Sequence, residues 1–205
     1  MAFTYFFRDL QTLNAVRDHA LPVLQSKGSI NIWDAGCASG QEPYSLSMLL
    51  NESMGQMLFQ KVRILATDID ESNLFAGMIR DGVYLREQVQ RIPKEFFKRY
   101  FTEEESSGKY RLDKEIRASV QFIKHDLLSL SPPEKEFGLV VCKNVLLHFT
   151  EQQRIEILKM FHDALAEDGF LVMEQTQKLP QELQELFQPL LSNARLYQKI
   201  EIFPC

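Results

Sequence analysis

The residues with the clearest capacity for chemistry lie between positions 30 and 45. A short apolar run of strand-like length ends in a carboxylate, Asp34, and a turn of small residues follows from Ala35 to Gly40. Such a turn lets backbone N–H groups approach a ligand closely, and a helix that starts directly after it adds further donors. We therefore predict a cradle for a nucleotide-type ligand that includes Gly36. The alternative is a plain tight turn between a strand and a helix.

The helix after this turn is predicted from its expected first residues. Ser39 stands three residues before Glu42, which is the spacing of a capping box. Leu46, Leu49 and Leu50 follow with helical period. The pattern thus predicts a helix whose N-terminus points at the turn.

A second carboxylate follows the next apolar run. Residues 62–67 are typical of a strand, and Asp68 closes it. A carboxylate at the end of the second strand of such a unit lies where a bound cofactor presents its ribose hydroxyls. Asp68 and Asp70 could instead cap a helix expected over residues 72–78. We assign Asp68 to the ligand and Asp70 to the cap.

The composition excludes several classes of function. The chain has 205 residues, of which 45% are hydrophobic and 25% charged, as in one globular α/β domain. Its net charge of -5 argues against broad binding to nucleic acid. No apolar stretch is long enough to insert in a membrane, and no secretory signal pattern opens the chain. Cys37, Cys142 and Cys205 lack metal-ligand spacing, so we expect no metal site, reduced thiols and a cytoplasmic location.

Strands and helices alternate along most of the chain, which predicts an open, mostly parallel sheet with helices on both faces. Apolar residues recur at helical spacing over residues 6–24 and predict a helix that starts near Thr4. Thr150 and Gln153 form a second capping box, and its helix is expected to end at Asp168–Gly169. Further strands are expected over residues 120–123, 137–142, 170–173 and 196–203, and a further helix over 181–190.

Residues 80–119 depart from this alternation. A charged helix is expected over Lys94–Phe101, an acidic loop follows it, and the residues around Tyr110–Leu112 could form a small hairpin. We interpret this stretch as an excursion from the main sheet, and not a second full domain, within a single domain that spans residues 1–205.

Six short motifs occur in a fixed order along the chain, namely Thr4–Arg8, Ala38–Ser45, Ala66–Asp70, Gly82–Tyr84, Arg99–Phe101 and Cys142–Phe149. In this order, and with these gaps, they resemble the catalytic domain of the chemotaxis receptor glutamate methyltransferases (CheR type). The resemblance runs from Thr4 to about Lys178, and it implies that residues 80–119 are the family's small inserted β-subdomain. It implies a class I methyltransferase (Rossmann-like) fold, S-adenosyl-L-methionine as methyl donor, S-adenosyl-L-homocysteine as product, and transfer to a glutamate carboxylate of a receptor protein.

The resemblance also implies roles for residues near the reacting end of the donor. Thr4 and Arg8 match a hydroxyl and a guanidinium that lie by the donor's methionyl end and the reacting centre. Glu42 matches an acid of the family's glycine-rich motif. Asp68 matches the acid on the ribose side.

Two further pairs follow from the same resemblance. Asp126 and Leu127 fall on the pair beside the adenine, although Asp126 could also simply shape a turn. Lys143 and Asn144 fall on the pair near the methionine part of the donor. Asn144 is either such a contact or a local turn former.

This chain departs from the family pattern at several positions. Gln41 replaces the first motif glutamate, His148 replaces a tyrosine at the rim of the site, and Glu174–Gln177 replaces a Gly-His-Ser-Glu motif. Ala2 stands where the family has an asparagine. The resemblance covers the catalytic domain without the helical N-terminal domain that usually precedes Thr4. We expect donor binding to survive these changes better than substrate identity.

Methyl transfer from a sulfonium is an in-line displacement, so the protein has to align the reacting atoms and exclude water. A carboxylate nucleophile is already ionised at neutral pH and needs only a group that orients it. Arg8 suits that catalytic role because a guanidinium binds a carboxylate through two parallel hydrogen bonds. A surface arginine on the first helix is the alternative.

His148 leaves the acceptor open. An imidazole, with an unperturbed pKa near ~6.5, could accept a proton from a hydroxyl, amine or thiol, or it could have no chemical task. The expected partner is a protein substrate, and the resemblance implies the cytoplasmic helices of a chemoreceptor. The charged residues Arg91–Arg99 either bind an acidic helix of that partner or form a solvated face. A methyltransferase with a different acceptor, or a non-catalytic donor-binding sensor, remains the alternative function.

Overall fold

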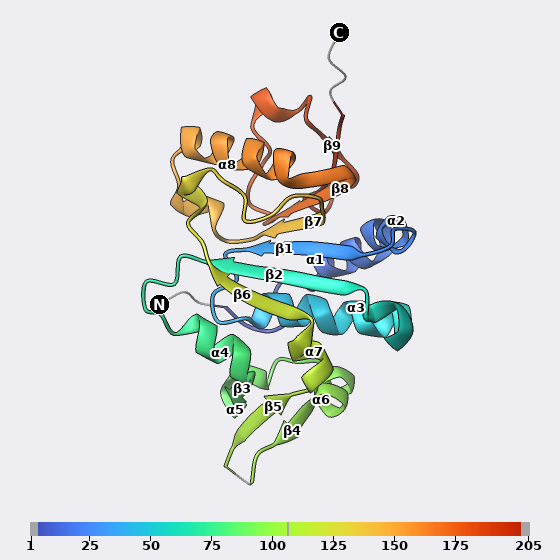
Figure 1. The fold of residues 1–205 in the computed structure, drawn as a ribbon, viewed down its shortest axis with the longest axis vertical. Coiled ribbons are helices and arrows are strands. Elements are labelled where there is room, and N and C mark those ends of the chain that lie inside the picture. Colours follow the sequence, from blue (N-terminus) through green and yellow to red (C-terminus); the bar gives the residue numbers. More distant parts are fainter. Residues whose placement is uncertain (1–3, 106, 202–205) are drawn as a thin grey trace.

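The structure is a computed structural model that describes residues 4–105 and 107–201. Its main sheet has seven strands in the order β6-β2-β1-β7-β8-β10-β9 (Figure 1). The first five of these are mutually parallel, and β10 runs antiparallel to both of its neighbours. The predicted open, mostly parallel sheet is therefore confirmed. The strands are β1 (Ile30–Ala35), β2 (Val62–Asp68), β6 (Val120–Lys124), β7 (Phe137–Cys142), β8 (Leu165–Met173), β9 (Phe187–Pro189) and β10 (Leu196–Lys199).

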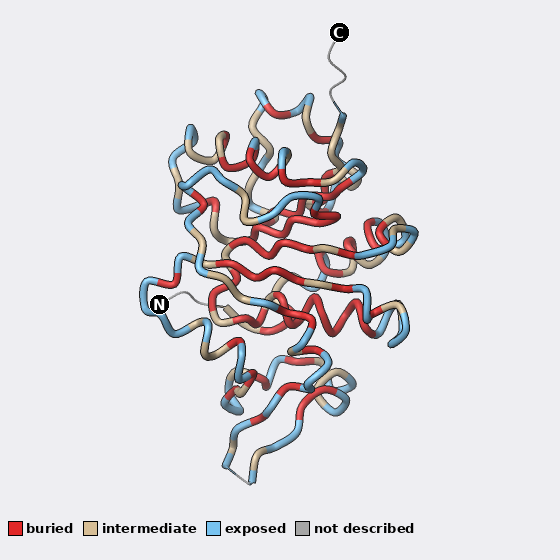
Figure 2. Tube along the Cα trace, viewed as in Figure 1, coloured by how far each residue is buried: buried red, intermediate tan, exposed pale blue. Residues whose placement is uncertain are grey.

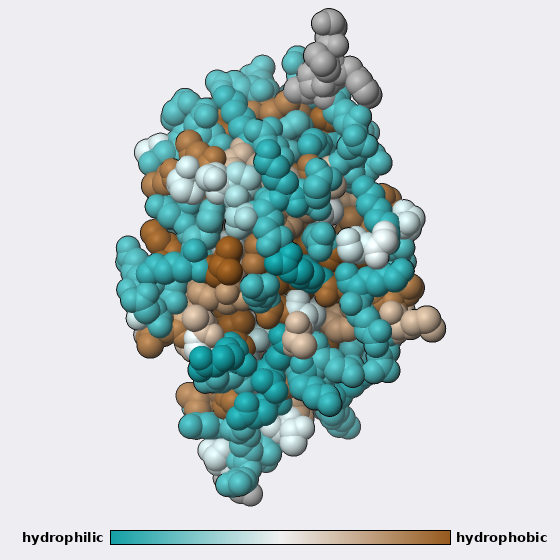
Figure 3. Space-filling view, in the orientation of Figure 1, coloured by the Kyte–Doolittle hydropathy of each residue, from teal (hydrophilic) through white to brown (hydrophobic). Residues whose placement is uncertain are grey.

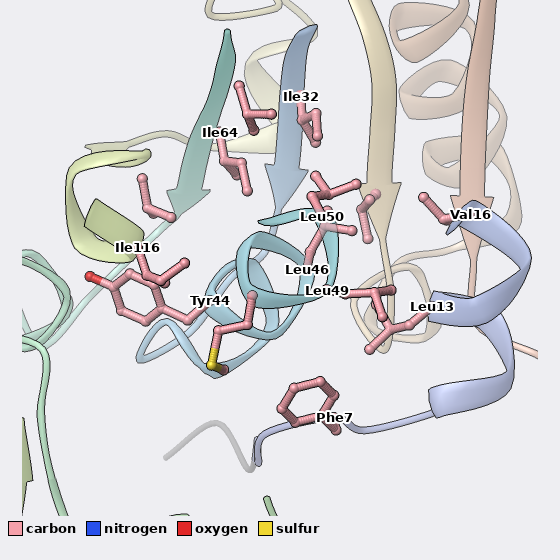
Figure 4. Packing of buried hydrophobic residues seen from close by; sticks show 14 of the residues in the cluster. Phe7, Leu13, Val16, Ile32, Tyr44, Leu46, Leu49, Leu50, Ile64 and Ile116 are labelled. Atoms are coloured by element: carbon pink, nitrogen blue, oxygen red, sulfur yellow. The ribbon is translucent and has the colours of Figure 1, made fainter. Parts of the chain in front are cut away.

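Helices cover both faces of this sheet, as predicted. Successive residues of a strand point to opposite faces, so Ile32 and Trp33 of β1 belong to two different hydrophobic clusters. The cluster of Ile32 packs against α3 (Gln41–Phe59), and the cluster of Trp33 against α8 (Glu151–Ala164). Figure 4 shows Ile32 facing Leu46 and neighbouring residues of α3. The central strands are the most completely buried part of the chain (Figure 2).

The N-terminal helix starts later than expected. Phe7 and Asp9 have positive φ angles of 56° and 57°, which are incompatible with a helix that starts near Thr4. The Asp9 carboxylate accepts a hydrogen bond from the Thr12 N–H at 3.3 Å and caps the helix instead. The segment continues as α1 (Leu10–Ala15), a π-helical turn (Val16–Ala20) and α2 (Leu21–Gln25).

The region 80–119 contains a small antiparallel sheet in the order β3-β5-β4, which confirms the predicted hairpin. The charged helix ends at Tyr100, one residue earlier than expected, because Phe101 pairs with Leu112 in the sheet. The elements here are α4 (Phe75–Asp81), β3 (Val83–Leu85), α5 (Arg86–Val89), α6 (Lys94–Tyr100), β4 (Phe101–Glu103), β5 (Lys109–Leu112) and α7 (Lys114–Ala118).

The C-terminal third contains one confirmed signal and two corrections. The capping box of Thr150 and Gln153 is present at the start of α8. That helix ends at Ala164 and not at Asp168–Gly169, because Leu165 already pairs with β7. The helix predicted over residues 181–190 is wrong as well.

In its place stand a 3-10 turn (Gln181–Leu183) and strand β9, which pairs with β10. The pairing partner of β9 lies in another segment, so the local pattern does not reveal it. Strand β10 ends at Lys199, and residues 202–203 of the predicted closing strand lie outside the described residues, as do Ala2 and Cys205.

Within residues 4–105 and 107–201, no helix is both long and apolar enough to cross a membrane. The surface seen in Figure 3 is mainly hydrophilic, with smaller hydrophobic patches between polar side chains.

Candidate active site

A cavity of about 710 Å³ lies at the carboxyl ends of the parallel strands. Sites for ligands of cofactor size commonly enclose roughly 300–1,000 Å³, so an adenosyl compound fits this volume. All ten residues that the sequence singled out contribute to its lining: Thr4, Arg8, Gly36, Glu42, Asp68, Asp126, Leu127, Lys143, Asn144 and His148. Segments far apart in the sequence therefore meet at one place. The individual role of each residue stays a prediction.

The turn after β1 is fixed against the neighbouring strand. The N–H groups of Gly36 and Cys37 donate to the Thr67 carbonyl oxygen at 2.7 and 3.0 Å. Gly36 has a φ of 98°, and a Cβ placed there would lie 2.2 Å from Cγ2 of Val145. Only glycine therefore fits this position without strain.

The first predicted capping box is not formed. Helix α3 starts at Gln41, with Gly40 as its N-cap and no side-chain cap. The Ser39 hydroxyl donates instead to the side-chain oxygen of Gln41 at 2.8 Å. The Glu42 carboxylate pairs with the Lys143 ammonium. The N-terminus of α3 nevertheless follows the turn as expected.

Asp68 and Asp70 differ in their hydrogen bonds, and the ligand role assigned to Asp68 stays a prediction. One oxygen of Asp68 accepts the Ala38 N–H and the other accepts the Asp70 N–H, both at 3.0 Å. Each carboxylate oxygen has a second lone pair, so Asp68 can still accept ribose hydroxyls. Asp70 accepts the N–H groups of Leu74 and Phe75 at 3.1 Å, although the helix expected over residues 72–78 is α4 at Phe75–Asp81 and its N-cap residue is Leu74.

Asp126 and Leu127 follow β6 at the same edge. The Asp126 carboxylate accepts the Leu128 N–H at 2.9 Å and so shapes a short 3-10 turn. Leu127 is buried, whereas Leu128 is 44% exposed, and both line the cavity. These neighbours form an apolar wall with a carboxylate beside it, which suits a purine ring with an exocyclic amine.

Lys143 and Glu42 form a buried ion pair with an Nζ–Oε2 distance of 2.8 Å, and their side chains are 1% and 12% exposed. Burial by itself lowers the pKa of Lys143, but the charge and hydrogen bond of Glu42, together with the charges of Asp9 and Asp34, raise the pKa above its usual value. Lys143 is therefore an ammonium, and it also donates to the Arg8 carbonyl oxygen at 3.1 Å.

Arg8 is half-buried and lies in an irregular segment before α1 and not on the first helix, and its catalytic role stays a prediction. Its guanidinium lies 5.8 Å from the ring centroid of Tyr5, and the guanidinium of Arg91 lies 4.8 Å from the same ring. His148 is exposed, ends a short 3-10 turn before α8, and lines the cavity together with Leu147.

Two buried carboxyl groups were not predicted as part of this region. Glu174 accepts the N–H of Asn144, which has a φ of 60°, at 3.2 Å, and burial raises the pKa of Glu174. Asp34 is fully buried, and neither of its oxygens has a hydrogen-bond partner among the described residues. Burial, and then the charge of Glu42, raises the pKa of Asp34 well above its usual range. Their signal in the sequence is a carboxylate next to the end of an apolar strand.

A parallel sheet with helices on both faces, a small-residue turn after β1 and an acid at the end of β2 define a Rossmann-like domain of the class I methyltransferase type. Residues 2–195 match the family model "CheR methyltransferase, SAM binding domain". The chain belongs to this family, which confirms the resemblance inferred from its motifs and makes S-adenosylmethionine its cofactor.

Individual relatives agree with this assignment. The chain is 32% identical over 184 residues to the chemotaxis protein methyltransferase of Borreliella burgdorferi, covering 86% of this chain and 64% of that protein. It is 33% identical over 184 residues to chemotaxis protein methyltransferase 1 of Pseudomonas aeruginosa, covering 86% and 66%. The chain thus spans a little under two thirds of these relatives. A solved TehB-like SAM-dependent methyltransferase of Corynebacterium glutamicum is 16% identical, with coverage of 93% and 91% and a TM-score of 0.47.

Proposed function

We propose that this protein transfers the methyl group of S-adenosylmethionine to a glutamate side chain of a chemoreceptor-like protein and forms a methyl ester. The observation that carries the proposal is the convergence of the donor-side acids and the Arg8 guanidinium on one cavity. We also propose a cytoplasmic location and one domain over residues 1–205, with residues 80–119 as its inserted subdomain.

In the proposed reaction an oxygen of the acceptor carboxylate forms a bond to the methyl carbon while the carbon–sulfur bond breaks. The electron pair of that bond stays on sulfur, so S-adenosylhomocysteine leaves as a neutral thioether and no proton has to move. When bound, the donor supplies the electrophilic methyl group. Arg8 orients the acceptor carboxylate, Asp68 holds the ribose, and Asp126 with Leu127 holds the adenine.

The test uses the wild-type chain, donor labelled in its methyl group and cytoplasmic fragments of chemoreceptors. Label that is released by mild base supports the glutamate ester. Matched fragments in which the candidate glutamates are changed to aspartate serve as the control and should take up less label. Donor binding without transfer to these fragments or to any lysate protein would instead indicate a donor-binding sensor.

A second acceptor class is favoured by one observation. His148 lines the cavity where the resemblance expects a tyrosine. An imidazole at this place can remove a proton from a hydroxyl, amine or thiol acceptor, which a carboxylate acceptor does not require. Base-stable label, lost in His148→Tyr, would support this second function over the ester.

Membership of the CheR family also supports a proposal for the protein partner. The basic stretch over residues 91–99 includes Arg91, whose guanidinium packs on Tyr5, and Arg99, which pairs with Glu52 at 3.0 Å. We propose that it faces an acidic segment of the receptor. Loss of fragment binding in Lys94→Glu/Lys98→Glu, with unchanged donor affinity, is the expected result.

A further inference from the structure

The segment that carries Arg8 has a backbone that needs external support. Both neighbours of Arg8, Phe7 and Asp9, adopt left-handed conformations that non-glycine residues rarely populate. Such conformations persist only where surrounding contacts hold them. The Phe7 N–H donates to the hydroxyl of Ser45 at 2.8 Å, and Phe6 is buried against the rings of Tyr84 and Phe101. The contacts of Phe6 and Phe7 thus anchor the segment on the N-terminal side of Arg8.

Lys143 supplies the anchor at Arg8 itself. Its ammonium reaches the Arg8 carbonyl oxygen at 3.1 Å from a position 135 residues away in sequence. The same ammonium is held at 2.8 Å from Glu42 at the start of α3. A lysine has three N–H donors, so two of them are already committed within the protein. The side chain is 1% exposed, which leaves little freedom for it to turn toward a ligand.

We infer that Lys143 is a positioning residue, which acts by fixing the backbone at Arg8 and so sets where the guanidinium meets the acceptor. This inference rests on the proposed function, because it concerns the alignment of the acceptor. It differs from the role that the resemblance implies, in which Lys143 contacts the donor directly. The ion pair with Glu42 holds the ammonium in place, so α3 and the end of β7 together support the N-terminal segment.

The decisive variant is Lys143→Met, which keeps the length of the side chain and removes the charge and the donors. Hydrogen exchange of a peptide covering residues 4–13 should become at least about threefold faster without any substrate present. Lys143→Arg, which keeps a cationic donor, should stay close to the wild type. The control is Lys159→Met, since Lys159 is an exposed lysine paired with Glu156 at 3.1 Å on α8, and it should leave this exchange unchanged.

A double-mutant cycle with Arg8→Ala then tests the route of action. In the otherwise wild-type protein, Lys143→Met should lower kcat for methyl transfer by roughly 30–100-fold. In the Arg8→Ala background it should lower kcat by less than about threefold, because the effects of residues that act through one another are not additive. The Kd of S-adenosylhomocysteine, measured by calorimetry, should change less than about threefold.

Three results would overturn the inference: unchanged exchange of residues 4–13, effects that multiply in the cycle, or a Kd that rises in proportion to the loss of turnover. A misfolded Lys143→Met protein would be recognised by its melting curve, and Lys143→Gln, which keeps an N–H donor without the charge, would then replace it. A wild-type protein that transfers no methyl group would refute the proposed function. The exchange experiment would still decide whether Lys143 holds the segment.

Discussion

The two halves of the cavity are built in different ways. The proposed donor half consists of residues at or just after the ends of parallel strands, such as Gly36, Asp68 and Asp126, which are hydrogen-bonded to backbone groups of this edge of the sheet. The acceptor half includes Arg8, whose segment is irregular and depends on Lys143, 135 residues away. Strand ends are placed by the sheet itself, whereas Arg8 is placed by a small number of contacts between distant segments.

This difference teaches where such a protein can change. We expect the proposed donor half to tolerate substitutions elsewhere, because its carboxylates accept hydrogen bonds from backbone N–H groups at the edge of the sheet. We expect a proposed acceptor half with few long-range contacts to be altered more easily by single substitutions, and His148, which lines the same cavity, is one candidate position. We therefore expect donor binding and acceptor choice to respond separately to mutation.

Removal of the Arg8 guanidinium should give the largest difference between the effect on turnover and the effect on donor affinity. Arg8→Ala should lower kcat by roughly 10²–10³-fold, because a poorly aligned nucleophile loses much of the benefit of positioning. The Kd of S-adenosylhomocysteine should rise by less than about tenfold. Label transfer and calorimetry measure the two quantities. Arg17→Ala, which removes an exposed arginine paired with Asp18, should change neither, and full turnover in Arg8→Ala would remove Arg8 from the acceptor half.

The opposite pattern is expected for the donor half. Asp68→Ala should weaken donor binding by roughly 10–100-fold, because each hydrogen bond to a charged group contributes about 1.5–3 kcal/mol. Since Asp68 also accepts the N–H groups of Ala38 and Asp70, a thermal melt has to accompany the calorimetry. Asp81→Ala, at an exposed residue paired with Arg80, is the control. Wild-type affinity in Asp68→Ala would show that the ribose is held elsewhere.

The turn itself can be tested through stability. Gly36→Ala should lower the free energy of unfolding by about 1–2 kcal/mol, because the residue keeps a positive φ and its new Cβ would meet Val145. Urea unfolding followed by circular dichroism measures the change. Gly28→Ala places a Cβ with no heavy atom within 4 Å and should stay within about 0.5 kcal/mol of the wild type. Equal losses in both variants would contradict a special requirement at Gly36.

The smallest effect concerns the buried Asp34 beneath the donor half. Its pKa in the folded protein is raised above the ordinary value of 3.8, so the folded state holds this proton more tightly than the unfolded state does. The stabilisation is complete below that ordinary value and is lost as the pH rises through the raised pKa. Asp34→Asn removes this loss, so the Tm of the variant relative to wild type should increase as the pH rises from that ordinary value through the raised pKa.

The expected gain is a few degrees, since ~1 kcal/mol shifts the Tm of a domain of this size by roughly 2–4 °C. Asp18→Asn, at an exposed residue whose pKa is lowered by Arg17, should show a difference that is flat over this range. A flat difference for Asp34→Asn as well would mean that its carboxyl group does not titrate in the folded protein as its burial requires.

Much of the sheet could be predicted because its strands are strongly apolar and end in charged residues. The bounds of β2 and β7 agree with the apolar runs that predicted them, and the capping box at Thr150 is formed as its spacing indicates. The box at Ser39 has equally good spacing but is absent, because Glu42 is drawn to Lys143. A local pattern describes what a side chain can do, and a competing distant partner decides what it does.

The sequence by itself determined the proposed donor half of this protein, namely a small-residue turn and acids placed at or just after the ends of apolar strands. Those signals are local, and the parallel sheet brings them to one edge. Only the tertiary structure decided that Lys143 supports Arg8, that Glu42 is an ion-pair partner and that Asp34 is buried. Burial and charge pairing depend on which segments meet in space. The local sequence around one residue does not reveal a partner more than a hundred positions away.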